Sequence, residues 1–343
     1  MRVKLKDVCE KATSNLKQSD ILSLGGKYPV YGASGYLGNI DSYHQDKPYI
    51  AVVKDGAGIG RTTILPPKSS VIGTMQYLIP KENVMPEYLY YVVKHMRLQK
   101  YYTGATIPHI YFKDYQNEEF NLADLNKQRE IVKVLKNVDN TIRYQEIEIN
   151  KFDELIKARF IEMFGDPITN SRSLSTNSLK DTLILKAGDF TEASNIFEEY
   201  SDVHPYPCYG GNGVRGFVSE YNQDGEYSLI GRQGALSGNV QFVAGKFKNT
   251  EHALLVTPLI SMNSIWLNQL LINLDLKRYQ TGAAQPGISV KNLQEIQIIM
   301  VPIAEQNKFA NFVKQVDKSR EEVKRSLEKT QQLYDSLMQE YFG

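Results

Sequence analysis

The sequence predicts an α+β protein in which two related, strand-rich globules are joined by two long antiparallel helices. Three observations predict this fold class. The second half of the chain repeats the first, each copy opens with short apolar runs between glycine-rich turns, and each copy closes with a long segment that has no internal glycine or proline. The predicted organisation is a globule over 1–124, a helix over 125–165, a second globule over 166–302 and a second helix over 303–343.

The repeat is a tandem duplication in one register. YPVYGASGYLG at 28–38 matches YPCYGGNGVRG at 206–216 in six of eleven positions, and YYTGATIPHI at 101–110 matches YQTGAAQPGI at 279–288 in six of ten. Both pairs are 178 residues apart, and the same shift relates FG at 164–165 to FG at 342–343. Two copies of one unit commonly pack about an approximate two-fold axis, so we expect a pseudo-two-fold internal repeat.

Composition narrows the function classes. A net charge of +1 over 343 residues is too small for a purely electrostatic nucleic-acid binder. Two cysteines cannot form a disulfide framework and favour a reducing compartment. No apolar run is long enough for a membrane span, so we expect a cytoplasmic protein without membrane contact. The 22 tyrosines beside one tryptophan suit a wet interface or a stacking surface.

Each globule is predicted to be rich in short strands. PYIAVV precedes the turn KDGAGIG, and YSLIG precedes RQGALSG. Short β-branched and aromatic runs between glycine-rich turns are typical of strands. One amphipathic stretch interrupts each globule, at 87–102 and at 265–280, and its apolar spacing predicts a helix.

The two closing segments predict a coiled coil. Alternating steps of three and four residues from Leu135, and again from Val313, fall mainly on apolar side chains, which is a heptad seam. A helix of this length would extend about 60 Å at ~1.5 Å per residue. The alternative is two independent helices, each packed on its own globule. The predicted seam residues are Leu135, Val138, Ile142, Ile149, Phe152, Ile156, Val313, Val316, Val323, Leu327, Tyr334 and Leu337.

The sequence shows no motif for chemistry. There is no G-x-x-x-x-G-K-[ST] phosphate loop, and G-A-G-I-G-R at 56–61 fails the dinucleotide-binding spacing. His204 and Cys208 could form half a metal site, but no second pair lies nearby in the sequence, so no metal site is predicted. An enzyme with a site where a globule meets a helix stays a weak alternative, because no acid, base or nucleophile constellation is identifiable.

The chain resembles the specificity subunits of type I restriction–modification enzymes. The resemblance rests on the order globule, helix, globule, helix, on the paired YP turns, on the glycine loops at 56–60 and 234–238, on the TGA segments at 103–108 and 281–286, and on FGDP after the first helix. It implies that 1–124 and 166–302 are target-recognition domains, each reading half of a split, asymmetric DNA target. It also implies that the helices set the spacing and dock two methyltransferase subunits, with restriction and translocase subunits where these are present.

Under this resemblance the chain is a non-catalytic DNA-binding subunit that binds no cofactor itself. S-adenosylmethionine is then expected on the methyltransferase subunits, and ATP and Mg on a restriction subunit. The competing hypothesis is a two-headed scaffold that binds proteins and has no DNA specificity. In that case the tyrosines would form a protein interface.

The duplication provides an internal control for finding base-reading positions. Residues that are equal in both copies should be scaffold, and unequal polar residues near the shared turns should read bases, because Arg, Lys, Asn and Gln can bond to base edges. The candidates are Ser34, Lys54, Asp55, Arg61, Thr74, His109, Asn212, Arg215, Arg232, Gln233, Asn239, His252 and Gln285.

Charge differs between the two globules. Residues 1–124 carry 15 basic and 12 acidic side chains (+3), and residues 166–302 carry 10 and 13 (−3). Neither globule can neutralise many phosphates, so we expect weak non-specific affinity for DNA. The hypothesis is that the methyltransferase subunits supply the missing positive charge.

Overall fold

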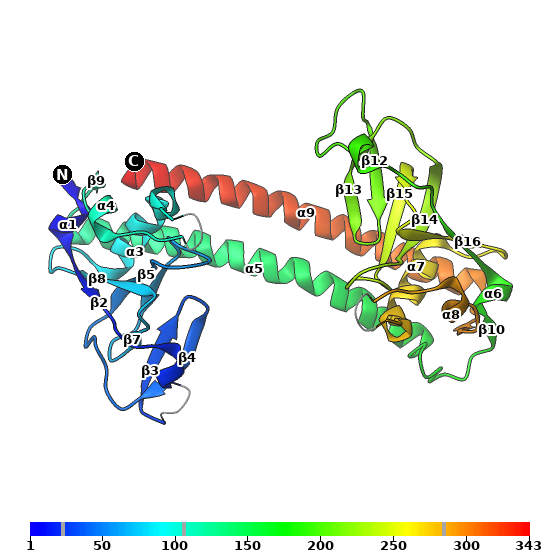
Figure 1. Ribbon diagram of the computed structural model, residues 1–343, viewed down its shortest axis with the longest axis horizontal. Coiled ribbons are helices and arrows are strands. Elements are labelled where there is room, and N and C mark those ends of the chain that lie inside the picture. Colours follow the sequence, from blue (N-terminus) through cyan, green and yellow to red (C-terminus); the bar gives the residue numbers. More distant parts are fainter. Residues whose placement is uncertain (22–24, 105–107, 283–285) are drawn as a thin grey trace. The chain divides into compact units, whose positions relative to one another are not determined.

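The computed structural model describes residues 1–21, 25–104, 108–282 and 286–343 (Figure 1). Its contacts divide the chain into two compact units. Unit 1 is Met1–Glu146 with Arg325–Gly343, and unit 2 is Ile147–Lys324. Both divisions fall inside long helices, α5 (Leu125–Phe164) and α9 (Ile303–Phe342), so each unit combines strands with parts of both helices. The domain boundaries drawn from the sequence follow a different criterion and stay a prediction.

Unit 1 contains small sheets and short helices. Its elements before α5 are β1 (Arg2–Lys4), α1 (Leu5–Val8), β2 (Cys9–Thr13), α2 (Gln18–Ile21), β3 (Tyr28–Gly32), β4 (Gly35–Ile40), β5 (Tyr49–Val53), β6 (Thr62–Leu65), β7 (Ser70–Val71), β8 (Met75–Pro80), α3 (Pro86–His95), η1 (Leu98–Tyr101), α4 (Phe112–Tyr115) and β9 (Glu119–Asn121). The strand orders are β2-β8-β5-β6, β4-β3-β7 and β1-β9, and only β3 and β7 pair in parallel.

Unit 2 repeats this plan with longer strands. Its elements between α5 and α9 are β10 (Thr176–Ser178), α6 (Leu179–Thr182), β11 (Leu183–Ala187), η2 (Ala193–Asn195), β12 (Tyr206–Gly210), β13 (Gly213–Val218), β14 (Gln223–Gly231), β15 (Val240–Asn249), β16 (Ala253–Pro258), α7 (Ser264–Asn273), η3 (Leu276–Tyr279), α8 (Val290–Gln294) and β17 (Gln297–Ile299). Six strands form one sheet in the order β11-β16-β14-β15-β12-β13, and β10 pairs with β17.

One pair of prolines explains why the sheet is continuous in only one unit. In unit 2 the long strand β15 pairs with β14 along most of its length and with β12 at its end. The corresponding chain of unit 1 is split into β6 and β7 by Pro66 and Pro67. Proline has no N–H to donate to a ladder, so the strand stops there and resumes in a second sheet.

The amphipathic stretches are shorter helices than predicted. The helix expected over 87–102 is α3 followed by the 3₁₀ turn η1, and the helix expected over 265–280 is α7 followed by η3. Arg97 and Asp275 separate the two parts with φ of 49° and 48°. A left-handed residue cannot continue a right-handed helix, which corrects the prediction of one uninterrupted helix in each globule.

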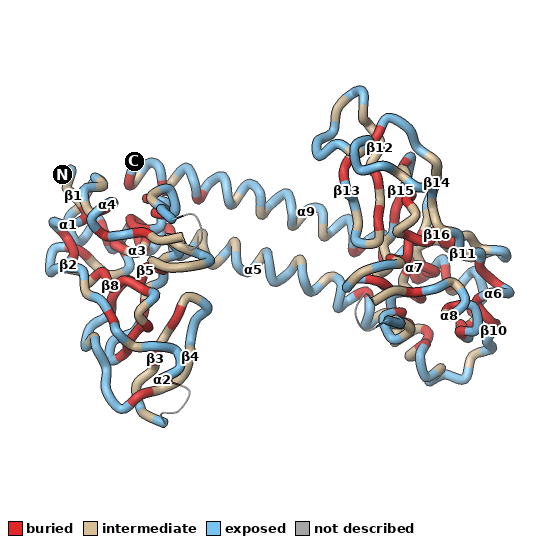
Figure 2. Tube along the Cα trace, in the orientation of Figure 1, coloured by how far each residue is buried: buried red, intermediate tan, exposed pale blue. Residues whose placement is uncertain are grey.

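The core of each unit lies between the sheet, the short helix and the long helices (Figure 2). In unit 1, α3 buries Leu89 and Val92 against α5 residues such as Leu135. In unit 2, Trp266 and Leu270 of α7 pack with Phe160 of α5. Helix α5 begins after Asp124, whose Oδ1 accepts from the N–H groups of Asn126 and Lys127, and it ends at Gly165 (φ 78°).

Candidate nucleic-acid interface

Four predicted side chains from separate segments gather beside the glycine loop of unit 1. The N–H groups of Lys54 and Asp55 both donate to the Thr74 carbonyl, at 3.0 and 3.3 Å. His109 forms an isolated antiparallel β-bridge with Asp55. Its Nδ1 also lies 2.7 Å from Asp55 Oδ1. The Ile110 N–H donates to the Lys54 carbonyl at 2.9 Å. The structure thus brings Lys54, Asp55, Thr74 and His109 together in what we call the unit 1 polar group.

A second connection joins the same loop to the β3–β4 turn. The Arg61 guanidinium donates from Nη1 to the Ala33 carbonyl at 3.1 Å. Ser34 is the next residue and is exposed in the turn. Arg61 therefore lies at the turn that carries Ser34, and the side chain of Tyr36, 61% exposed, follows on β4.

Unit 2 builds the corresponding place with the same backbone bonds and different side chains. The Arg232 N–H donates to the His252 carbonyl at 2.9 Å, and its carbonyl accepts from the Ile288 N–H at 2.8 Å. Gln233 bridges Gly287, and His252 Nδ1 lies 2.9 Å from Gln233 Oε1. These bonds match those of Lys54, Asp55 and Thr74 at a shift of 178. Arg232, Gln233 and His252 form the unit 2 polar group.

The remaining predicted residues of unit 2 are placed differently. Asn212 is exposed in the β12–β13 turn, and exposed Arg215 on β13 lays its aliphatic stem against Gly210. Asn239 lines a cavity with Asp153 and Lys277, and no described contact joins its side chain to the unit 2 polar group. Gln285 lies outside the described residues.

Sequence reasoning missed two neighbours of these groups. Glu251 Oε1 lies 3.0 Å from His252 Nε2, and the Tyr111 ring stacks on His109 with centroids 6.3 Å apart. Both could have been found, because their counterparts at a shift of 178 are Gly73 and Ser289. At both positions the two copies carry different residues, and each position lies next to or near a predicted base-reading residue.

A family model for the type I restriction modification DNA specificity domain matches residues 1–152 and, again, residues 176–331. The chain belongs to this family. The two matches correspond to the two copies of the repeat, so each polar group lies in its own specificity domain.

Curated relatives carry the same description. The chain is 41% identical over 140 residues to the type I restriction enzyme EcoprrI specificity subunit of Escherichia coli. It is 26% identical over 110 residues to the putative type I restriction enzyme specificity subunit S.HindORF215P of Haemophilus influenzae. The alignments cover 41% and 31% of this chain but only 35% and 29% of those relatives.

Solved structures share the fold. The type I restriction-modification S subunit of M. genitalium superposes with a TM-score of 0.65 at 18% identity and covers 100% of this chain and 96% of its own. A chain from a structural study of complex assembly and conformational transition in a type I R-M system gives 0.59 at 14% identity, with 99% and 97% covered. Both likenesses concern the fold alone.

The predicted seam residues are all buried or half-buried. Those in unit 1 are Leu135, Val138, Ile142, Leu327, Tyr334 and Leu337, and those in unit 2 are Ile149, Phe152, Ile156, Val313, Val316 and Val323. The helices run antiparallel in both units. Gln145 Nε2 donates to Ser326 Oγ at 2.8 Å in unit 1, and Asp153 pairs with Arg320 in unit 2 at 2.5 Å. Each unit therefore contains a stretch of packing between α5 and α9.

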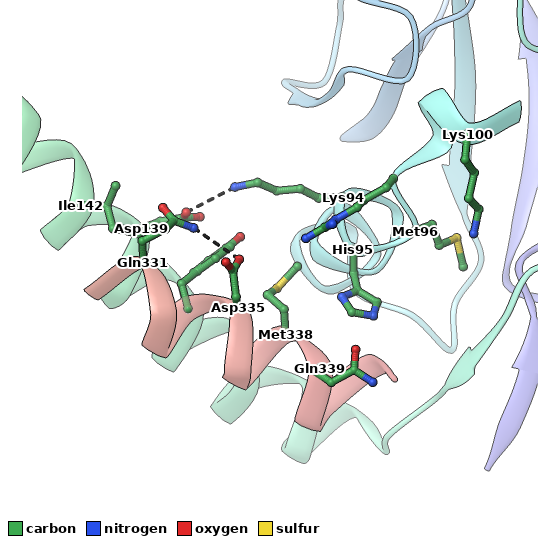
Figure 3. A pocket seen from close by; sticks show the side chains of 12 residues that line it. Lys94, His95, Met96, Lys100, Asp139, Ile142, Gln331, Asp335, Met338 and Gln339 are labelled. Carbon is green, nitrogen blue, oxygen red and sulfur yellow. Dashed lines mark hydrogen bonds and ion pairs between the residues drawn. The ribbon is translucent and has the colours of Figure 1, made fainter. Parts of the chain in front are cut away.

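A cavity of matching location lies beside the long helices of each domain. In unit 1 its volume is about 610 Å³ (Figure 3), and Lys94 crosses it to lie 3.3 Å from Asp139. In unit 2 the volume is about 550 Å³, and Ile272 replaces the lysine. The two units thus have cavities at corresponding positions, but a charged lysine in unit 1 is replaced by an apolar isoleucine in unit 2.

In the described ranges, no group of three His, Cys, Asp or Glu side chains is placed to hold a metal ion. No helix among those residues has the length and apolar character needed to cross a membrane.

Proposed function

We propose that this chain is the DNA-reading, non-catalytic subunit of a type I restriction–modification complex and that each specificity domain reads one half of a split, asymmetric target. One observation carries the proposal. The two polar groups rest on the same backbone hydrogen bonds at the same positions of the repeat, yet they present different side chains.

That combination suits sequence-specific recognition. Contacts to phosphates position a protein on the duplex, whereas side-chain contacts to base edges carry the sequence information. A conserved loop path with exchanged polar side chains lets two domains approach DNA alike and read different bases. Arg61 and Arg232 carry guanidinium groups, which can bond guanine, and Gln233 has an amide that can bond adenine.

The partners follow from the same proposal. The chain would bind double-stranded DNA and assemble with other subunits of the system, its long helices docking two methyltransferase subunits. S-adenosylmethionine would be held by those subunits, and ATP and Mg by a restriction subunit where one is present. Modest net charge supports this division, because the chain alone cannot neutralise many phosphates.

Methylome sequencing tests the proposal. Cells that carry the chain should show adenine methylation at a two-part motif, and deleting its gene should abolish that motif while other methylated motifs stay. Replacing residues 166–302 by the second globule of another specificity subunit should change one half of the motif only. A methylome that is identical with and without the gene would contradict the proposal and favour the protein-binding scaffold.

A further inference from the structure

Asp55 and Gln233 occupy the same position of the repeat, directly after the central strands β5 and β14. Each is followed by a glycine with positive φ, 85° at Gly56 and 83° at Gly234. A Cβ built on either glycine would meet no atom of the described residues within 4 Å. The loop therefore leaves open space beside this position, and a large ligand can approach it closely.

The Asp55 carboxylate has one oxygen engaged and one available. A carboxylate only accepts hydrogen bonds, so His109 donates from Nδ1 to Oδ1 across 2.7 Å. Oδ2 lies 4.0 Å from Lys54 Nζ, which is beyond hydrogen-bond distance. The side chain of Asp55 is 28% exposed. Its second oxygen therefore keeps acceptor capacity, since no donor of the described residues lies within hydrogen-bond distance of it.

The His109 bond is not needed to form the loop. In unit 2 the equivalent of His109 is Gly287, which still bridges Gln233 through the backbone, and the Gly234 N–H still donates to Pro286 at 2.9 Å. In unit 2 the imidazole of His252, which belongs to a different segment, forms a hydrogen bond with Gln233 instead. Both units thus orient the side chain at this position with a histidine, although the backbone forms without one.

We propose that Asp55 reads an exocyclic amino group of a base, cytosine N4 or adenine N6, in the half-site of unit 1, and that His109 is the residue that positions its carboxylate. This inference rests on the proposed function. Phosphates repel a carboxylate, so Asp55 weakens binding unless a donor meets it, and these amino groups are the donors that the major groove offers. The arrangement rejects bases that present only acceptors at that point.

The test uses the complex that copurifies with the full chain and a library of duplexes randomised over both half-sites. The bound fraction is sequenced for wild type, D55N and the control D46N, which changes an exposed carboxylate outside the group. Asn at 55 can still accept from His109 but presents an amide donor. We expect D55N to shift base preference at one position of one half-site by about 5- to 150-fold, with every other position and D46N unchanged.

A positioning role for His109 has its own readout. H109G, which copies unit 2, should flatten the preference at that same position without lowering the melting temperature. H109Q should restore part of the preference, since its amide N–H can replace Nδ1–H. If H109G leaves the preference intact, His109 does not position Asp55.

If D55N folds poorly, the wild-type complex can be tested on a duplex analogue that lacks the amino group. Its affinity for that analogue should fall by the same factor as its affinity for a duplex with a mismatched base at that position. An unchanged preference in folded D55N, or full wild-type binding of every amino-lacking analogue, overturns the inference. A wild-type complex without any sequence preference would instead overturn the proposed function.

Discussion

Arg97 and Asp275 end the short helices α3 and α7 in the left-handed conformation. Glycine usually takes this place, because a Cβ in the left-handed region costs about 1–2 kcal/mol. Both copies accept the cost at the same position, and the first residue of the turn that follows, Leu98 of η1 and Leu276 of η3, is buried in the core. In unit 1 Arg97 lines the same cavity as His95 and Lys100, both of which are labelled in Figure 3.

His95 makes unit 1 sensitive to mild acid. Burial lowers the pKa of His95, and the nearby Arg97 and Lys100 lower it further against the opposing effect of Glu118. Because the folded-state pKa is depressed, the unfolded chain binds more protons below pH ~6.5 and stability falls as pH decreases through that range. We expect the melting temperature to drop between pH 7.5 and 5.5 and H95N, which copies Asn273 of unit 2, to flatten that dependence. Equal slopes for both proteins would contradict this.

A buried glutamine near the start of each long helix forms hydrogen bonds with the segment that precedes the short helix. Gln128 Oε1 accepts from the Met85 N–H at 2.8 Å, and Gln306 Oε1 accepts from the Asn263 N–H at 2.8 Å. Gln128 Nε2 also donates to the carbonyls of Asn83 and Ala123. Both glutamines are at most 2% exposed. Gln306 Nε2 likewise donates to the Val301 carbonyl, the counterpart of Ala123, so two of the three hydrogen bonds of Gln128 recur in the second copy.

Removing these hydrogen bonds should be costly. In Q128A the half-buried Met85 N–H loses its acceptor, and an unsatisfied buried group costs about 1–3 kcal/mol. We expect urea unfolding to show a lower midpoint with an unchanged slope. Lys133 lies exposed on the same helix, and K133A should leave the midpoint within ~0.5 kcal/mol of wild type. A Q128A midpoint equal to that of K133A would show that the hydrogen bonds of Gln128 contribute nothing measurable.

Elements were predictable from the sequence where the pattern is long. The heptad runs predicted the long helices, which begin and end within one residue of 125–165 and 303–343. The break at Arg97 was not predictable, because a left-handed arginine leaves no compositional signal. The glycine spacing located the loops that carry the polar groups. It could not show that Asn239 lines a cavity with Asp153 and Lys277, since a residue's position in a loop does not fix its side-chain direction.

The charge difference between the two globules comes from one segment. Residues 188–205 carry five acidic side chains and no lysine or arginine (−5), whereas residues 10–27 carry three lysines and two acids (+1). That difference of six equals the whole difference between +3 and −3. Within unit 2 the segment bridges β13 at Phe217, toward the open end of the β12–β13 hairpin, away from the Gly210–Gly213 turn. Glu198 and Glu199, which follow Phe197 in the chain, thus come next to the residue that pairs at the open end of the hairpin.

This distribution predicts how binding depends on salt. The purified chain alone should bind DNA weakly at physiological salt, with a shallow slope of log K against log salt, because few phosphates are neutralised. Adding the copurifying subunits should raise the affinity and steepen the slope. Gel shifts over a salt series check this. Tight, specific binding by the isolated chain would remove the need for charge from partners.

The two polar groups are held by corresponding backbone hydrogen bonds, and this has an evolutionary consequence. Main-chain atoms hold the loops at Lys54 and Arg232, so the side chains mounted on them contribute little to folding. Substitutions at 55, 109, 233 and 252 can then accumulate without loss of the native state. A lineage could acquire a new DNA preference through a few codon changes in one copy while the other copy kept the old one.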